Sequence, residues 1–201
     1  GCFIKPDPPG LGPLLDNALR CSCHCQDLGS RMQPILASAQ DVEQTGNGTM
    51  EFASTDLDIG ERIVGLRFEN VVLPADATVL TAYVQFSANE DLSVETDVQI
   101  AADLSASAAP FTATPNDLSG RTKGVSVQWQ PPTWVGGDAN DDEKTADIAT
   151  VIQQLVHVDG WSDESPIVLI IEATAGITTG HRSARSYDGT SGRAPILVVT
   201  Y

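Results

Sequence analysis

The chain of 201 residues is poor in basic side chains, in aromatic rings and in long apolar runs. Its 11 Lys and Arg are outnumbered by 27 Asp and Glu, which gives a formal net charge of −16. A field of that sign repels phosphate, so we expect no nucleic acid partner and no binding to an anionic membrane surface. No run approaches the roughly 18 apolar residues of a membrane span, so no span is expected. Aromatic residues make up only 5% of the chain, so the core must consist mainly of Val, Ile, Leu and Ala.

The sequence also lacks the short motifs of common catalytic sites. It contains no G-x-S-x-G, no P-loop and no H-E-x-x-H. His157 and His181 have no nucleophile motif nearby, and no carboxylate pair is singled out by its spacing. We therefore predict a protein that is not an enzyme.

Cysteine is absent after residue 25, although four cysteines precede it. The stretch from Gly1 to Pro13 contains four prolines and three glycines, which precludes a regular helix. We therefore predict two parts, an irregular Cys-containing N-terminal arm over 1–32 and a β-sandwich domain over 33–201 that needs no disulfide. Because the chain begins at Gly1 rather than Met, we expect a mature exported product.

The stretch from Arg62 to Ala88 has the clearest strand pattern. Apolar residues occupy every second position in two runs, first Val64, Leu66 and Phe68, and then Leu80, Ala82, Val84, Phe86 and Ala88. Side chains alternate between the two faces of a strand, so each run predicts a strand with one buried face. Pro74 lies between the runs and has no N–H for a ladder, so the chain must turn or change sheets there.

Further short strands are expected on both sides of this stretch. They are predicted over 33–38, 49–54, 98–102, 125–129, 166–173, 182–187 and 194–201, with 182–187 as an exposed strand. Residues 103–124 are rich in Ser, Ala, Thr, Pro and Gly and are expected to form a long surface loop.

One segment, 145–159, predicts a helix. Thr145 is a candidate cap, Asp147 suits the positive N-terminal end, and Gly160 is a good stop. Its apolar stripe consists of Ile148, Ile152, Leu155 and Val156. Many short strands, long loops and one short helix predict an all-β fold, a jelly-roll-like antiparallel β-sandwich.

The β part carries an ordered series of motifs. They are V-G-L-R-F-x-N-V-x-L-P-A-D-A-T (64–78), A-Y-V-Q-F (82–86), S-V-x-W-x-P-x-x-W (126–134), I-x-x-x-I-Q-Q-L-V (148–156), G-W (160–161), R-S-Y-D-G (185–189) and A-P-I-L-V-V-T-Y (194–201). The series resembles secreted bacterial β-sandwich modules of cell-surface and adhesin-like proteins, and is similar to DNRLRE-type domains grouped with carbohydrate-binding modules. The resemblance covers about residues 40–201 and not the arm. It implies a non-catalytic extracellular module and transfers no site residue.

The densest group of candidate ligands is Cys21, Cys23 and Cys25 with His24 and Cys2. In an exported chain four cysteines favour two disulfides, one of which can join neighbouring subunits. The Cys-x-Cys spacing also suits a thiolate-bound metal such as Zn, Cu(I) or an Fe–S cluster. Cys23-His24 matches the end of a C-x-x-C-H haem c attachment site with His24 as axial ligand, but Cys21 lies one residue too close.

A second candidate site is the acidic loop before the helix. Its oxygen-bearing side chains are those of Asp138, Asn140, Asp141 and Asp142. Ca²⁺ takes six to eight oxygen ligands, so this loop is a candidate calcium site, although it lacks EF-hand spacing. The alternative is a solvated acidic loop that leads into the helix N-terminus.

The three tryptophans suggest a sugar-stacking platform or a core. Trp129 shares a strand face with Val125 and Val127, and Trp161 follows the helix stop, so both are expected in the core. Trp134 follows two prolines and is the best candidate for an exposed ring that stacks on a glycan.

The leading hypothesis is a secreted, non-catalytic structural subunit of an extracellular filament or surface assembly. It is motivated by a proline-rich arm that contains every cysteine of a chain whose β part does not need it. The arm would link neighbouring subunits into a homo-oligomer or polymer, for example by strand addition at a sheet edge. Two alternatives are a carbohydrate-binding or adhesin module that uses Trp134, and a redox fibre with haem or metal in the arm.

Overall fold

The computed structural model describes residues 29–175 and 180–201. The cysteines and His24 therefore lie outside the described residues. The strands are β1 (Ser30–Pro34), β2 (Asp41–Gln44), β3 (Met50–Glu51), β4 (Asp56–Ile59), β5 (Ile63–Phe68), β6 (Thr81–Gln85), β7 (Val98–Asp103), β8 (Lys123–Trp129), β9 (Ile167–Ala173), β10 (Arg182–Arg185) and β11 (Ile196–Thr200). The helices are α1 (Ala149–Val156) and α2 (Tyr187–Thr190), with 3-10 turns η1 (Ser38–Gln40) and η2 (Ser191–Arg193).

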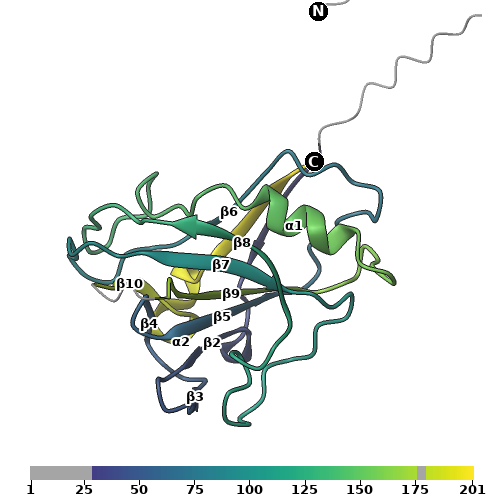
Figure 1. Cartoon of the computed structure of the whole chain (residues 1–201). Helices are drawn as coiled ribbons and strands as arrows, with labels where there is room; N and C mark the ends of the chain where they lie inside the picture. Colours follow the sequence, from purple (N-terminus) through teal and green to yellow (C-terminus); the bar gives the residue numbers. More distant parts are fainter. Residues whose placement is uncertain (1–28, 176–179) are drawn as a thin grey trace, which may run out of the picture.

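The strands form two main sheets and one small one (Figure 1). The large sheet has the order β3-β2-β5-β9-β7-β8, the second sheet has the order β1-β11-β6, and β4 pairs with β10. Every pair of neighbouring strands is antiparallel. The prediction of an all-β, antiparallel sandwich with one short helix in the 145–159 region is confirmed.

The chain changes sheets where Pro74 interrupts the strand pattern. β5 lies in the large sheet and β6 in the three-stranded sheet, so the connection between them crosses from one layer to the other. Pro74 accepts a turn hydrogen bond from Ala77 within this connection. Proline has no N–H to donate, but no ladder hydrogen bond is lost here because Pro74 belongs to neither ladder.

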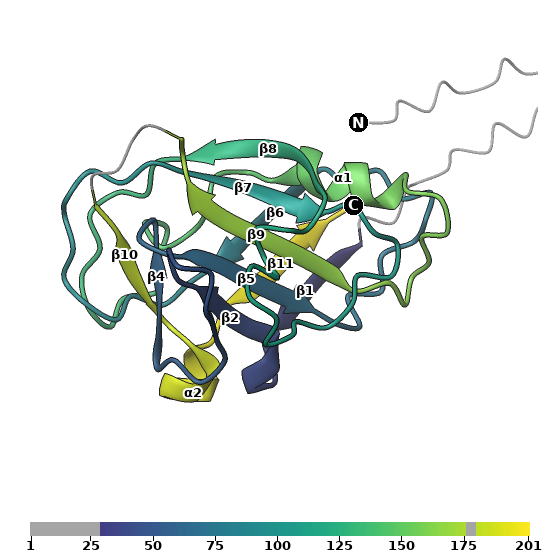
Figure 2. The same cartoon turned by 60° about the horizontal axis from the view of Figure 1, so that its bottom comes forward.

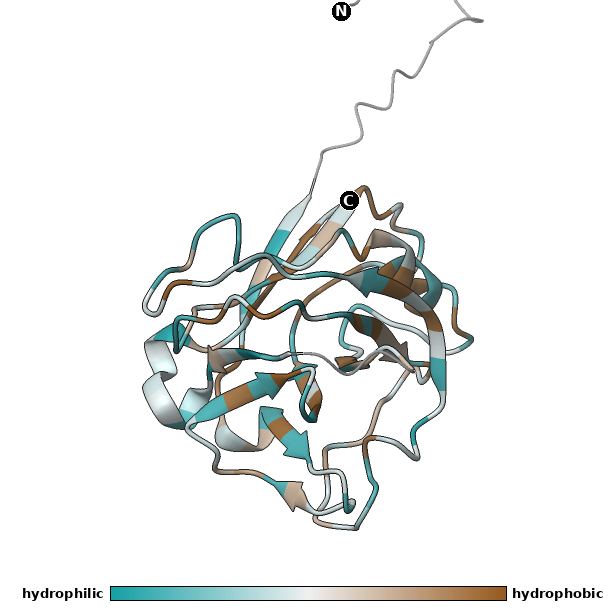
Figure 3. Cartoon of the chain, turned by 60° about the vertical axis from the view of Figure 1, so that its left-hand side comes forward, coloured by the Kyte–Doolittle hydropathy of each residue, from teal (hydrophilic) through white to brown (hydrophobic). Residues whose placement is uncertain are grey.

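The space between the two main sheets is filled by the alternating apolar residues. Val64, Leu66 and Phe68 of β5 join Ala82 and Val84 of β6 in one cluster, and each of these side chains is at most 1% exposed. Hydrophobic and hydrophilic residues alternate along several strands (Figure 3). Since this pattern buries one face of each strand, it specifies the register of the sheets.

The outer face of the large sheet is covered by the loop predicted over 103–124. Phe111 and Leu118 from this loop pack with Val42 of β2 and with Val168 and Ile170 of β9 in a second buried cluster. The loop therefore contributes a small core of its own. The mostly polar composition of this loop did not predict its packing on the sheet. Two apolar residues are enough to anchor the loop there.

Several details of the strand predictions are wrong. The strands expected over 33–38 and 49–54 are found at Ser30–Pro34 and Met50–Glu51, and β2 and β4 were not expected. Val125 is 47% exposed and Leu80 is 48% exposed, although both were expected in the core. The irregular register of β8 against β7 near Val125 explains the first case, and Leu80 precedes the strand in the second. The expected exposed strand over 182–187 is instead the buried β10, with Arg182 only 1% exposed.

The helix is shorter than predicted and begins differently. Its N-cap is Ile148, which has no side-chain cap. The hydroxyl of Thr145 accepts a hydrogen bond from Val84 N–H of β6 instead, and Asp147 accepts from both Ala82 N–H and Ala149 N–H. Residues 145–148 thus serve mainly as an addition to the edge of β6.

The sandwich begins before the predicted boundary at residue 33. Ser30–Pro34 forms β1, which pairs with β11, and Gly29 exchanges two backbone hydrogen bonds with Tyr201. The part of the predicted arm that remains outside the described residues is therefore 1–28.

A substitution at Gly65 tests how closely the loop over 103–124 packs on the large sheet. A Cβ at this position would lie 2.6 Å from Leu118 Cδ2 and 2.9 Å from Phe111 Cζ. We expect Gly65→Ala to lower the free energy of unfolding by about 1–3 kcal/mol, because the extra methyl overpacks a closed contact. Urea unfolding measures this change. Gly192→Ala is the control, since its Cβ meets nothing within 4 Å, and an equal loss in both variants would contradict the packing described.

Candidate functional site

The structure contradicts the prediction that Trp134 is an exposed sugar-stacking residue. Its side chain is 0% exposed and lies in the core with Phe86 and Trp129, at ring-centroid distances of 6.1 and 6.2 Å. Its indole N–H donates to the backbone oxygen of Asp142 at 2.9 Å. Trp129 and Trp161 are 4% and 7% exposed, so the prediction that they are core residues is confirmed. A ring enclosed in this way has no face for a sugar.

The acidic loop does not assemble a calcium site. Asp138, Asn140, Asp141 and Asp142 are all exposed, and they satisfy one another locally. Asn140 accepts from Asp142 N–H and donates to Asp138, while Asp141 pairs with Lys144. Within residues 29–175 and 180–201, no group of three or more His, Cys, Asp or Glu side chains is arranged to hold a metal ion. The solvated loop is therefore the better description of this segment.

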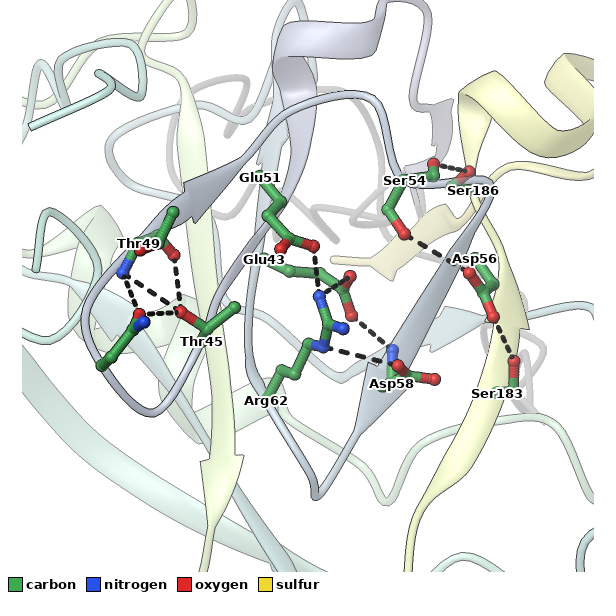
Figure 4. Close-up of polar contacts among 11 residues, drawn as sticks. Glu43, Thr45, Thr49, Glu51, Ser54, Asp56, Asp58, Arg62, Ser183 and Ser186 are labelled. Atoms are coloured by element: carbon green, nitrogen blue, oxygen red, sulfur yellow. Dashed lines mark hydrogen bonds and ion pairs between the residues drawn. The ribbon is translucent and has the colours of Figure 1, made fainter. Parts of the chain in front are cut away.

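A cluster of carboxylates surrounds Arg62 (Figure 4). Arg62 follows the tight turn between β4 and β5, in which Gly60 has a φ of +101°. Its guanidinium contacts Glu43 of β2 at 3.3 Å, Asp58 of β4 at 3.5 Å, and Glu51 of β3. One arginine thus joins carboxylates from three strands.

Glu43 is the member of this cluster that is fully buried, with 0% of the residue exposed. One of its oxygens accepts from Asp58 N–H at 2.6 Å and the other contacts Arg62. Burial raises the pKa of Glu43 to about 7, although these two contacts lower it. Removal of the Glu43 carboxylate from water therefore raises its pKa by more than the contacts with Arg62 and Asp58 N–H lower it.

Asp41 lies two residues earlier on β2 and is also buried, at 3% exposure. It accepts from the backbone N–H of Tyr187, the first residue of α2, at 2.7 Å. Its other oxygen, Oδ1, is buried without a hydrogen-bond partner. Burial raises the pKa of Asp41 to about 6, and the charge of Asp188 adds to this increase.

Together these contacts attach the small β4–β10 sheet and α2 to the large sheet. Glu43 holds β4 and Asp41 holds α2, while Ser183 of β10 donates to Asp56 at 3.1 Å and Ser186 donates to Ser54 O at 2.6 Å. Figure 4 shows the links of Glu43, Ser183 and Ser186. The arrangement explains the buried carboxylates as anchors for main-chain N–H groups.

A shallow pocket of about 140 Å³ lies beside Arg62. It is lined by residues of the β2–β3 turn and of the β4–β5 turn, including Gly46, Gly60 and Glu61. Glu61 also lies 3.7 Å from His181. Glu43, Glu51 and Asp58 are each engaged by Arg62, so the geometry indicates a structural cluster rather than a ligand site.

Sequence reasoning missed this cluster and also Arg182. The guanidinium of Arg182 donates to the backbone oxygens of Pro131, Pro132 and Val94 at 2.7–2.9 Å, and to Thr96 Oγ1 at 3.0 Å. It connects loops that are far apart in the sequence. No local signal marks such a residue, because its partners are main-chain oxygens that any residue supplies.

The candidate site that remains is the free edge of a sheet. β1 is the terminal strand of the three-stranded sheet, and Gly29 and Tyr201 form a hydrogen-bonded pair at its start. In an antiparallel ladder such pairs alternate, so the peptide groups of Ser30 and Met32 point away from β11. Met32 is 68% exposed, and Pro34 ends this edge because it has no N–H.

No protein-family model and no curated protein sequence matches this chain. The resemblance to secreted adhesin-like modules therefore stays a prediction. Among the described residues no helix is long and apolar enough to cross a membrane.

The buried carboxylates predict how stability depends on pH. The folded-state pKa values of Glu43 and Asp41 lie above their usual values, so the folded protein binds more protons between about pH 4 and pH 7. Stability is therefore greatest near the lower end of this range and falls as pH rises through about 7, by on the order of 2 kcal/mol for Glu43. Urea unfolding at pH 5 and pH 8 measures the difference.

The variant Glu43→Gln should flatten this pH dependence, because the titrating group is removed. Glu90→Gln is the matched control, since it removes one negative charge from an exposed position. If both variants keep the same slope between pH 5 and pH 8 as the unmodified chain, the assignment to Glu43 is wrong.

Proposed function

We propose that this protein is a non-catalytic structural subunit of an extracellular filament or surface assembly, in which residues 1–28 link one subunit to the next. A single observation carries the proposal. Among the described residues, the core between the two sheets contains none before Ile35, and residues 1–28 are joined to this body through the edge strand β1. The proposal assigns residues 1–28 to a neighbouring subunit rather than to this core.

The geometry of β1 supports this role. The outward N–H groups of Ser30 and Met32 lie toward the end of β1 that is next to residue 28, and Pro34 closes the other end. The Arg31 guanidinium donates to the outward oxygen of Ser30 at 3.1 Å, so the edge next to residue 28 is partly open. Main-chain pairing at such an edge stabilises an assembly without a specific side-chain pocket.

The cysteines supply a second kind of link. All four lie within the first 25 residues, and none occurs between residues 29 and 201. Disulfides persist in an oxidising, extracellular setting, which agrees with an exported assembly. The strongly acidic composition keeps the sandwich bodies soluble and apart, so a dedicated connecting segment has a clear purpose.

The glycan-binding alternative has lost its motivating residue, because Trp134 is enclosed in the core. The redox alternative depends on residues 2 and 21–25, which lie outside the described part of the chain. The structure thus favours neither over the assembly proposal.

Deletion of residues 1–28 tests the proposal. We expect the full chain to form particles larger than a few subunits by electron microscopy and sedimentation, and the shortened chain to lose them. A second variant with all four cysteines changed to Ser keeps the segment but removes covalent links. If the Ser variant still assembles, pairing at the edge is sufficient; if the shortened chain still assembles fully, the role assigned to residues 1–28 is wrong.

A further inference from the structure

The other open sheet edge is β8, at the end of the six-stranded sheet. The direction of its peptide groups follows from β7 and β9. Thr174 N–H donates to Asp97 O at 3.0 Å, so Asp97 and every second residue after it point toward β9. Val98 and Ile100 therefore point toward β8.

The residues of β8 opposite Val98 and Ile100 are Trp129 and Val127. These two residues complete the ladder with β7, so the peptide groups of Ser126 and Gln128 point away from the sheet. In the described part of the chain, no hydrogen bond joins these outward N–H and C=O groups to a partner. Figure 2 shows β8 along the margin of the molecule, with α1 beside its start.

Side chains do not cover this edge either. The hydroxyl of Ser126 lies 3.4 Å from Gln99, and the amide of Gln128 donates to Asp97 at 2.8 Å, so both side chains turn sideways onto β7. At the start of the strand, the side-chain oxygen of Gln154 of α1 accepts a hydrogen bond from Val125 N–H at 2.7 Å. The open edge therefore begins at Ser126.

The other edges leave less main chain open. Backbone groups of β6 bond to residues 143–148, and those of β10 bond to residues 87–89. β3 has two residues only, and β1 is interrupted by Pro34. In contrast, β8 after its first residue, Lys123, contains neither a proline nor a charged side chain, in a chain that carries 27 acidic residues. Edge strands of soluble proteins are usually protected by such residues, so their absence points to a pairing partner.

We propose that β8 pairs with β8 of a second copy of this chain, antiparallel and two-fold symmetric about Val127. In this register Ser126 lies opposite Gln128 of the second copy. Both outward-pointing residues of one copy then exchange N–H···O bonds with those of the other, and the two six-stranded sheets join into one.

Two features favour a second copy as the partner. The outward groups are self-complementary, because Ser126 and Gln128 are placed symmetrically on either side of Val127. Val127 packs against the main core, so a Val127–Val127 pair across the axis extends the apolar layer. Repulsion between two chains of net charge −16 is also lowest where they present a neutral surface.

Amide hydrogen exchange of the full chain tests this pairing. In the unmodified protein, exchange of the Ser126 and Gln128 amides is expected to become slow as protein concentration rises, with dimers seen by sedimentation. Combining Ser126→Lys with Gln128→Lys places like charges opposite each other across the axis. We expect dimerisation about tenfold weaker, and protection only at correspondingly higher concentration. Asp97 and Glu172 lie near these positions, which helps the folded chain to accept the lysines.

A second variant and a control separate pairing from folding or charge effects. Ser126→Pro removes one outward N–H without touching the ladder to β7, so it should also weaken the dimer while thermal unfolding shows a folded chain. Combining Thr133→Lys with Ala139→Lys adds the same charge at exposed loop positions and should leave the dimer unchanged.

Three results would overturn the proposal. They are exchange at Ser126 and Gln128 that is independent of concentration, protection that survives both β8 variants, and photo-cross-links from position 125 that reach residues 1–28 rather than β8 of another copy. The last result would make the N-terminal segment the occupant. The pairing uses no residue of 1–28, so this test and the deletion test can fail separately.

Discussion

The fold depends on the apolar layer that the strands of the two sheets share. β5 and β6 follow one another in the sequence but lie on opposite sides of this layer, and the connection that contains Pro74 takes the chain across. Since every second residue of each strand points into the layer, a slip of one residue would bury the polar face instead. At the edge strands β1 and β8, outward main-chain N–H groups have no strand partner among the described residues.

The small sheet of β4 and β10 is attached by polar contacts as well as by apolar packing. Glu43 and Asp41 receive main-chain N–H groups from β4 and from α2, and Arg62 offsets part of the cost of burying the first carboxylate. A buried carboxylate is costly unless its charge is matched, and one oxygen of Asp41 has no partner. The stability of this part of the molecule is therefore sensitive to protonation in a way that the apolar layer is not.

The sequence was most informative where a feature is local. Alternation in 64–68 and 82–88 predicted two half-buried strands, and the proline between them predicted the change of sheet. It was least informative where a residue is defined by partners far away in the chain. Trp134 follows two prolines and suggested an exposed ring, yet its indole is enclosed by Phe86 and Trp129. Arg182 suggested an exposed strand, but loops from 94–96 and 131–132 surround it.

The functional proposals concern the edge strands and residues 1–28. β8 contributes Trp129 to the apolar layer whereas no residue of β1 belongs to it, and residues 1–28 precede the described part of the chain. The most direct measurement compares the free energy of unfolding of the full chain with that of a chain beginning at Gly29, both at a concentration where they are monomeric. The account predicts values that agree within about 0.5 kcal/mol. A loss of several kcal/mol in the shorter chain would contradict it, because the N-terminal segment would then be part of its own subunit's core.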